Sequence, residues 1–212
     1  MKVLHTRNTP VNEPSKVHVG AGPQRLPGWT NVDVLPYAGI DLVLDVRESF
    51  PFENVQFIYA EHFIEHLPYR DAATFLRRCR TALRPDGILR LSTPNLDWVW
   101  VTQYHFGAWQ SEDEQVRDCF NLNKGFHGWG HQFLYNKSTL EQALRRAGFD
   151  CIVTCAYGDS VHPELRNIER HEQYLDDPSL PHVIVVEASG TTTGAVPSHP
   201  AENDYLNAID NP

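Results

Sequence analysis

Residues 16–33 read KVHVGAGPQRLPGWTNVD, and this stretch decides the fold. A short strand pattern of valines alternating with polar residues breaks at the Gly-Ala-Gly turn over 20–22 and resumes as a second strand over 29–34, with Asp33 near its end. Glycines let the backbone approach a ligand closely, and an acid at this place accepts hydrogen bonds from ribose hydroxyls. The stretch therefore indicates an open parallel sheet that holds an adenosine-containing ligand.

The same stretch departs from the dinucleotide-binding pattern. That pattern has a third small residue three positions after the second glycine and an acid about 20 residues from the motif. Here Arg25 takes the third position, Asp33 follows Gly20 by only 13 residues, and two prolines within 23–27 exclude a crossover helix. These features disfavour NAD and favour an adenosine ligand without phosphates. The alternative is a plain glycine turn between two core strands.

Composition limits the class of protein. The chain has 212 residues, enough for one domain with a sizeable core, and its formal net charge of −9 disfavours nucleic acid or an anionic membrane as a partner. The N-terminal residues lack the apolar run of a signal peptide, and no stretch is long enough to span a bilayer. Four cysteines without a Cys-x-x-Cys pair favour reduced thiols and a cytoplasmic protein.

Strand and helix patterns alternate along the rest of the chain, which is typical of an α/β domain with a mostly parallel sheet. Further strands are expected over 41–46, 55–60, 88–92, 151–156 and 182–187, and helices over 70–83 and 138–147. The expected organisation is an N-terminal arm over 1–15, one domain over 16–190 that contains an insert over 95–135, and a disordered tail over 191–212.

The insert over 95–135 is long, rich in aromatic residues and without clear periodicity, which indicates a lid or a binding segment. It contains His127 and His131 in the sequence FHGWGH. Because imidazole changes its protonation near neutral pH, these two histidines are the candidate catalytic bases. The alternative for each is a packing or loop hydrogen-bonding role.

The sequence from His62 to His66 matches the H-x-x-E-H pattern of one class of zinc peptidase. That chemistry needs both histidines on one face of a stable helix. Here a buried strand ends at Ala60 and Pro68 marks a helix start, so the motif is expected on a strand-to-helix turn. We therefore predict no metal site from this motif and expect His62 or His66 near the rim of the active site.

The ordered set of motifs resembles the class I S-adenosylmethionine-dependent methyltransferases of the small "type 11" sort. The resemblance rests on VHVGAGPQRLPGWTNVDV, DLVLDVRESFPF, FIYAEHFIEHL, FLRRCRTALRPDGILRLSTPN and HQFLYNKSTLEQALRRAGFD, which cover most of residues 16–190. It implies a Rossmann-like class I methyltransferase fold with an antiparallel last strand and a truncated first crossover. It also implies S-adenosyl-L-methionine as cofactor and a small-molecule or sugar acceptor.

The resemblance further implies roles for strand-end residues, which in open α/β sheets meet at one rim. Gly20 and Gly22 would lie against the methionine part of the cofactor, Asp33 with Val34 beside it would bind the ribose, Asp45 and Val46 would meet the adenine, and Ala60 and Glu61 would contact the methionyl amine. A non-catalytic binding or scaffolding module of the same fold is the alternative function. The acceptor and the oligomeric state are left open.

Overall fold

The computed structural model describes residues 15–171, 177–192 and 194–210. All but the last residue of the expected N-terminal arm lies outside the described residues. Within the described ranges, no helix combines the length and apolar character that crossing a bilayer requires.

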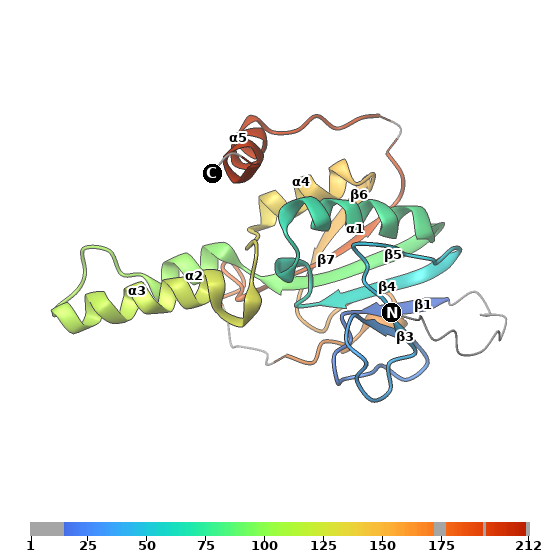
Figure 1. Ribbon diagram of the computed structural model, residues 1–212, viewed down its shortest axis with the longest axis horizontal. Helices are drawn as coiled ribbons and strands as arrows, with labels where there is room; N and C mark the ends of the chain where they lie inside the picture. The colour runs from blue at the N-terminus through green and yellow to red at the C-terminus, as the bar shows by residue number, and fades with distance from the viewer. Residues whose placement is uncertain (1–14, 172–176, 193, 211–212) are drawn as a thin grey trace, which may run out of the picture.

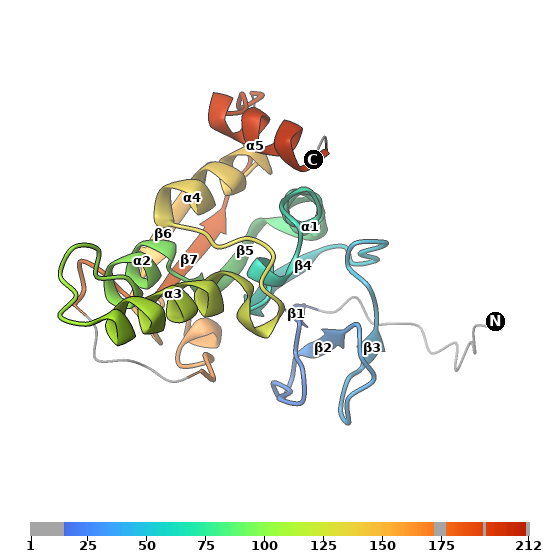
Figure 2. The same ribbon diagram turned by 60° about the vertical axis from the view of Figure 1, so that its left-hand side comes forward.

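Seven strands form one mixed sheet, as Figures 1 and 2 show. Its spatial order is β3-β2-β1-β4-β5-β7-β6, in which neighbours from β3 to β5 are parallel and β7 is antiparallel to both β5 and β6. The strands are β1 Lys16–Val19, β2 Thr30–Asp33, β3 Leu42–Val43, β4 Val55–Glu61, β5 Leu83–Pro94, β6 Cys151–Cys155 and β7 Val183–Ser189. The prediction of a mostly parallel sheet with an antiparallel last strand is confirmed.

The connection from β1 to β2 is short. Residues 20–29 contain only turns and bends, because two prolines interrupt them and the glycines adopt left-handed conformations, with φ +67° at Gly20 and +54° at Gly22. The truncated first crossover is therefore confirmed. Without a helix in this connection, the ends of β1 and β2 stay open at the rim of the sheet.

Helices α1 Tyr69–Ala82 and α4 Lys137–Arg146 cover one face of the sheet (Figure 1). Their apolar faces join the larger core cluster, to which β4 contributes Ile58. Along β4 the alternate residues Phe57 and Tyr59 point to the other face, where a smaller apolar cluster forms. Since side chains alternate along a strand, β4 is buried on both faces.

Irregular chain rather than a long helix covers that second face. Leu165, at the end of a short 3₁₀ helix over Pro163–Leu165, packs there with Trp29 and Tyr59. The fully buried Arg90 of β5 donates to Glu169 over 2.7 Å and to Glu187 over 2.6 Å. A buried charge must be paired, so this ion-pair network holds the segment that contains Glu169 against the sheet.

The insert contains two helices, α2 Leu96–Gln103 and α3 Glu112–His127, followed by a 3₁₀ turn over Gly128–Gly130. Figure 1 shows the α2–α3 pair extending away from the sheet. Asn95 and Ser111 cap the two helices by accepting hydrogen bonds from Asp97 N and Glu114 N. The helical content was not predicted because the apolar residues of α2 surround the helix instead of forming one stripe.

The prediction of a disordered tail is wrong for residues 200–210, which form helix α5, Pro200–Asp210. Proline at a first helical position is preorganised for a helix. Tyr205 packs against the larger core cluster, and ion pairs join Glu202 to Arg146 and Asp210 to Arg70. Tertiary contacts thus stabilise a helix that its polar composition did not suggest.

Candidate functional site

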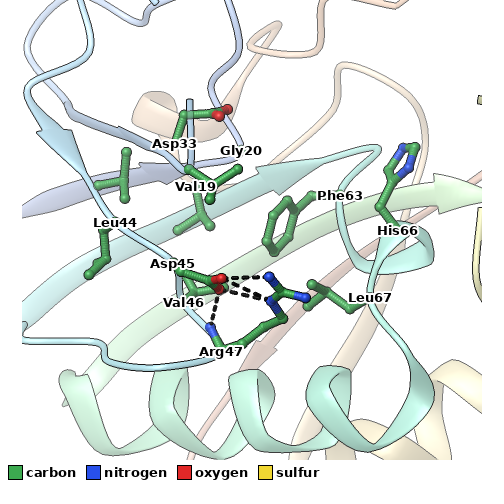
Figure 3. A pocket seen from close by; sticks show the side chains of 12 residues that line it. Val19, Gly20, Asp33, Leu44, Asp45, Val46, Arg47, Phe63, His66 and Leu67 are labelled. Carbon is green, nitrogen blue, oxygen red and sulfur yellow. Dashed lines mark hydrogen bonds and ion pairs between the residues drawn. The ribbon is translucent and has the colours of Figure 1, made fainter. Parts of the chain in front are cut away.

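A cavity opens at the carboxyl ends of β1 and β2 and beside the chain that follows β3 (Figure 3). We call it the strand-end pocket; its volume is about 260 Å³. Its walls are Val19, Gly20, Val32, Asp33, Val34, Leu44, Asp45, Val46, Arg47, Phe63, His66 and Leu67. Five of the eight residues predicted to bind a cofactor lie on this wall, namely Gly20, Asp33, Val34, Asp45 and Val46.

Gly20 is required at its position for two reasons. Its φ of +67° is a conformation that other residues rarely adopt, and a Cβ built on it would lie 2.5 Å from Cδ2 of Phe63. Figure 3 shows the Phe63 ring beside Gly20, facing the cavity. The glycine therefore lets an aromatic side chain from the β4–α1 connection close against the end of β1.

Asp33 is held by the backbone around it. Its Oδ2 accepts a hydrogen bond from Gly22 N over 2.9 Å, and its Oδ1 accepts one from Leu35 N over 2.8 Å. A carboxylate offers about four acceptor positions, so both oxygens keep capacity for a ligand hydroxyl. Gly22 does not line the cavity, and in this structure its role is to orient Asp33.

Asp45 is already engaged by a neighbouring cation. Arg47 donates from its backbone N over 2.9 Å, from Nε over 3.0 Å to both carboxylate oxygens, and from Nη2 over 2.6 Å. The Arg47 side-chain hydrogen bonds hold the pKa of Asp45 below its usual value. Arg47 is also a wall residue of the strand-end pocket, and the sequence interpretation did not include it.

Ala60 and Glu61 are placed differently from the other predicted residues, because neither lines the strand-end pocket. Ala60 is buried within β4. The Glu61 carboxylate accepts from Arg170 N over 2.8 Å, from His171 N over 3.1 Å and from His171 Nδ1 over 3.1 Å. Burial raises the pKa of Glu61, but the His171 and Arg170 hydrogen bonds outweigh it and hold the pKa below its usual value.

A second cavity of about 560 Å³ adjoins the first. We call it the histidine pocket. Its walls are His62, His66, Pro94, Trp98, Val99, Gln103, Asn121, Lys124, Gly125, Trp129, His131, His171 and His182. His66 belongs to the walls of both cavities, so the two spaces meet at this side chain.

The H-x-x-E-H motif lies on the expected strand-to-helix turn. A 3₁₀ helix over Ile64–His66 follows β4, and α1 begins at Tyr69 with Pro68 as its N-cap residue. His62 has a φ of +44°, a backbone conformation that few residues adopt, and its ring centre lies 4.0 Å from that of His171 with the rings tilted by 31°. His62 and His66 therefore line the histidine pocket from a turn, whereas the zinc-peptidase motif requires both histidines on one face of a helix.

Of the two candidate bases, His131 lines the histidine pocket, whereas His127 is the exposed last residue of α3 and is not among the wall residues. The Nδ1 of His131 lies 2.9 Å from the carbonyl oxygen of Gly125. A carbonyl only accepts, so Nδ1 carries a proton, and in the neutral imidazole Nε2 is the nitrogen with the lone pair.

His182 was missed in the sequence interpretation. It directly precedes β7, whose first residue Val183 pairs with Pro94 at the end of β5. Since β7 is antiparallel, its beginning lies at the rim where the parallel strands end. A histidine just before an antiparallel strand was therefore the signal that could have identified it.

The chain matches a family model described as a methyltransferase domain over residues 16–154. It is 32% identical over 118 residues to the "Ubiquinone biosynthesis O-methyltransferase" of Rhodopseudomonas palustris (strain HaA2), a match that covers 56% of this chain and 42% of that protein. The chain thus spans less than half the length of this curated relative.

Solved structures give weaker matches. The mitomycin 7-O-methyltransferase MmcR has 15% identity and a TM-score of 0.47, covering 83% of this chain and 48% of that chain. The complex of DhpI with SAH has 14% identity and a TM-score of 0.47, covering 83% of this chain and 76% of that chain.

Proposed function

Because the chain belongs to the methyltransferase-domain family, we propose that it transfers a methyl group from S-adenosyl-L-methionine to an oxygen of a small-molecule or sugar acceptor. The observation that carries the proposal is the meeting of two cavities at His66. Methyl transfer requires donor and acceptor to be held in line and in contact. Two adjoining cavities with different walls meet that requirement, and the name of the curated relative favours oxygen as the acceptor atom.

The strand-end pocket has the groups that the cofactor requires. Asp33 keeps acceptor capacity for the ribose hydroxyls, while Leu44, Val46 and Phe63 provide apolar walls for the adenine. S-adenosyl-L-methionine supplies, when bound, a methyl group that its sulfonium sulfur already activates. The short β1–β2 connection has no helix N-terminus to bind a pyrophosphate, which supports this cofactor over NAD.

The histidine pocket supports the acceptor assignment. Trp98, Val99 and Trp129 give it apolar walls, and most of its polar wall groups are imidazoles. The Nζ of Lys124 lies 5.0 Å from the ring centre of Trp129. Among the described residues that line this pocket there is no carboxylate, which favours a neutral or anionic acceptor over a cationic one.

The acceptor hydroxyl loses its proton in the transfer, and a general base on this wall would assist that loss. His131 presents a nitrogen with a free lone pair to the histidine pocket, fixed by its hydrogen bond to Gly125 O. We therefore assign this role to His131 and not to His127.

Isothermal titration calorimetry of the full chain with S-adenosylhomocysteine and with NAD tests the cofactor. The expected result is binding of the first and none of the second. Incubation with methyl-labelled cofactor and fractionated cell extract then tests transfer to a small molecule. Absence of any binding of S-adenosylhomocysteine or S-adenosylmethionine would refute the proposal, and binding without labelling of any small molecule would favour the non-catalytic module.

A further inference from the structure

Three potential metal ligands converge at His66, the side chain that the two cavities share. A carboxylate oxygen of Glu65 and one ring nitrogen each of His66 and His131 all lie within 4.8 Å of one another. Glu65 and His66 come from the 3₁₀ helix after β4, and His131 comes from the turn after α3. The cluster thus joins two elements that are 65 residues apart in the sequence.

Glu65 is a buried carboxylate that the residues around it satisfy only in part. It is 0% exposed, and its Oε2 accepts a hydrogen bond from the Thr93 hydroxyl over 3.0 Å. Its Oε1 has no hydrogen-bond partner among the described residues; His62 Nδ1 lies 3.3 Å away without hydrogen-bond geometry. A carboxylate removed from water costs several kcal/mol unless a cation or good hydrogen bonds compensate it. The position therefore favours a bound cation.

His131 is oriented as a metal ligand usually is. Ligating histidines donate their second ring N–H to a backbone carbonyl or a carboxylate, which fixes the ring and the tautomer. The Nδ1–H of His131 donates to Gly125 O in this way and leaves Nε2 as the ligand atom. The rings of His66 and His131 make an edge-to-face contact, with centres 5.1 Å apart and an interplanar angle of 68°.

We propose that Glu65, His66 and His131 bind one divalent transition-metal ion. Two imidazoles and one carboxylate are a ligand set that suits zinc and iron and leaves positions open for a further oxygen ligand. Ligand atoms around one zinc ion lie roughly 3–3.5 Å apart in tetrahedral geometry. Binding therefore requires the ligand atoms to move closer together, which the half-buried His66 and His131 side chains allow.

The proposal reverses the expectation of a metal-free protein. The sequence motif pairs His62 with His66, whereas the structure pairs His66 with His131. The metal site does not depend on methyl transfer. When metal is bound, the Nε2 lone pair of His131 is donated to the ion, so in the proposed function His131 would act through the cation and not as a free base. A cation beside His66 would lower the pKa of an acceptor hydroxyl placed at its open position, so that its proton leaves to solvent.

The test uses the full chain, stripped with a chelator, dialysed and titrated without cofactor. Zinc is followed by calorimetry, and cobalt(II) by its visible absorption. We expect one equivalent of metal per chain, and at least a roughly tenfold loss of affinity in both His66→Ala and His131→Ala. His127→Ala is the matched control, because it removes an exposed histidine from the same segment and should leave the titration unchanged.

Circular dichroism and melting curves of each variant establish that it is folded, and both ligand variants are expected to fold because the His66 and His131 side chains are only half-buried. Absence of stoichiometric binding by the wild type would overturn the proposal, as would zinc affinity equal to wild type in both ligand variants. Binding of S-adenosylhomocysteine is measured on the same samples. A failure of the metal site with intact cofactor binding is thereby distinguished from a failure of the proposed function.

Discussion

The strand-end pocket and the histidine pocket share one side chain but are built in different ways. The first draws all its walls from residues 19–47 and 63–67, at the ends of neighbouring strands. The second collects residues from 62–66, 94–103, 121–131 and the single positions His171 and His182. The strand order alone brings the first set together, whereas the second depends on how the insert and the last strands pack. If the pockets bind donor and acceptor as proposed, variants should affect the recognition of one without that of the other.

Gly20→Ala is expected to have the largest effect on the strand-end pocket alone. A Cβ there would lie 2.5 Å from the Phe63 ring at a φ of +67°, so Phe63 would be pushed into the strand-end pocket. We expect binding of S-adenosylhomocysteine to be lost and the free energy of unfolding to fall by about 1–3 kcal/mol. Calorimetry and thermal unfolding measure the two effects.

Gly28→Ala is the matched control for that variant. Gly28 also has a positive φ, +78°, but a Cβ there would meet nothing within 4 Å. It should share the backbone strain and keep cofactor affinity. Equal loss of affinity in both variants would show that strain alone, and not the contact with Phe63, explains the effect.

On the other side of the comparison, His131→Ala should leave the affinity for S-adenosylhomocysteine unchanged and lower turnover by about 10²-fold or more. The reason is that His131 lines only the histidine pocket. His127→Ala, which removes an exposed histidine outside both pockets, should turn over at the wild-type rate. Loss of cofactor affinity in His131→Ala would contradict the separation of the two pockets.

Asp33→Ala should weaken cofactor binding and leave the histidine pocket unaffected. Removing a carboxylate that accepts ligand hydroxyl groups is expected to cost about 1.5–3 kcal/mol, or roughly ten- to a hundredfold in cofactor affinity. Zinc affinity at the histidine pocket should stay at its wild-type value. The control is Asp86→Ala, because the Asp86 side chain is exposed near the beginning of β5, at the end of the strand away from the pocket. Unchanged cofactor affinity in Asp33→Ala would remove Asp33 from the site.

The smallest effect concerns the ion pair beside the histidine pocket. The hydrogen bond to Glu61 raises the pKa of His171 above its usual 6.5, and burial opposes this. Because folded His171 holds its proton more tightly, the pair stabilises the fold below about pH 6.5, and this contribution is lost as the pH rises through the raised pKa. NMR titration of the ring should show a lower pKa in Glu61→Gln. Glu164→Gln, on the exposed 3₁₀ helix, should not change it, and equal titration curves in all three proteins would refute the pairing.

The sequence sufficed for the sheet because its signals were local. The glycine turn, the prolines within 23–27 and the short apolar runs each predict their own element, and parallel topology places the strand ends together. The hydrogen bonds of Glu61 could not be predicted from the sequence, because its partners at 170 and 171 lie more than 100 residues away. The same holds for Glu65 with His131, since the contact depends on the path of α3 back to the sheet. Helix α5 was missed because packing against Tyr69 and Phe133, and not composition, stabilises it.

The buried Arg90 has a consequence for how the chain acquires its structure during synthesis. Its two carboxylate partners follow it by 79 and 97 residues. At about 5–20 residues per second, a ribosome needs roughly 5–20 s to deliver the second of them. During that interval the Arg90 guanidinium must stay hydrated. The face of β5 that carries Arg90 therefore cannot be buried before its partners are synthesised. The cover over Trp29, Phe57 and Tyr59 therefore closes late, and a nascent chain halted before Glu169 should keep those aromatic side chains accessible to chaperones.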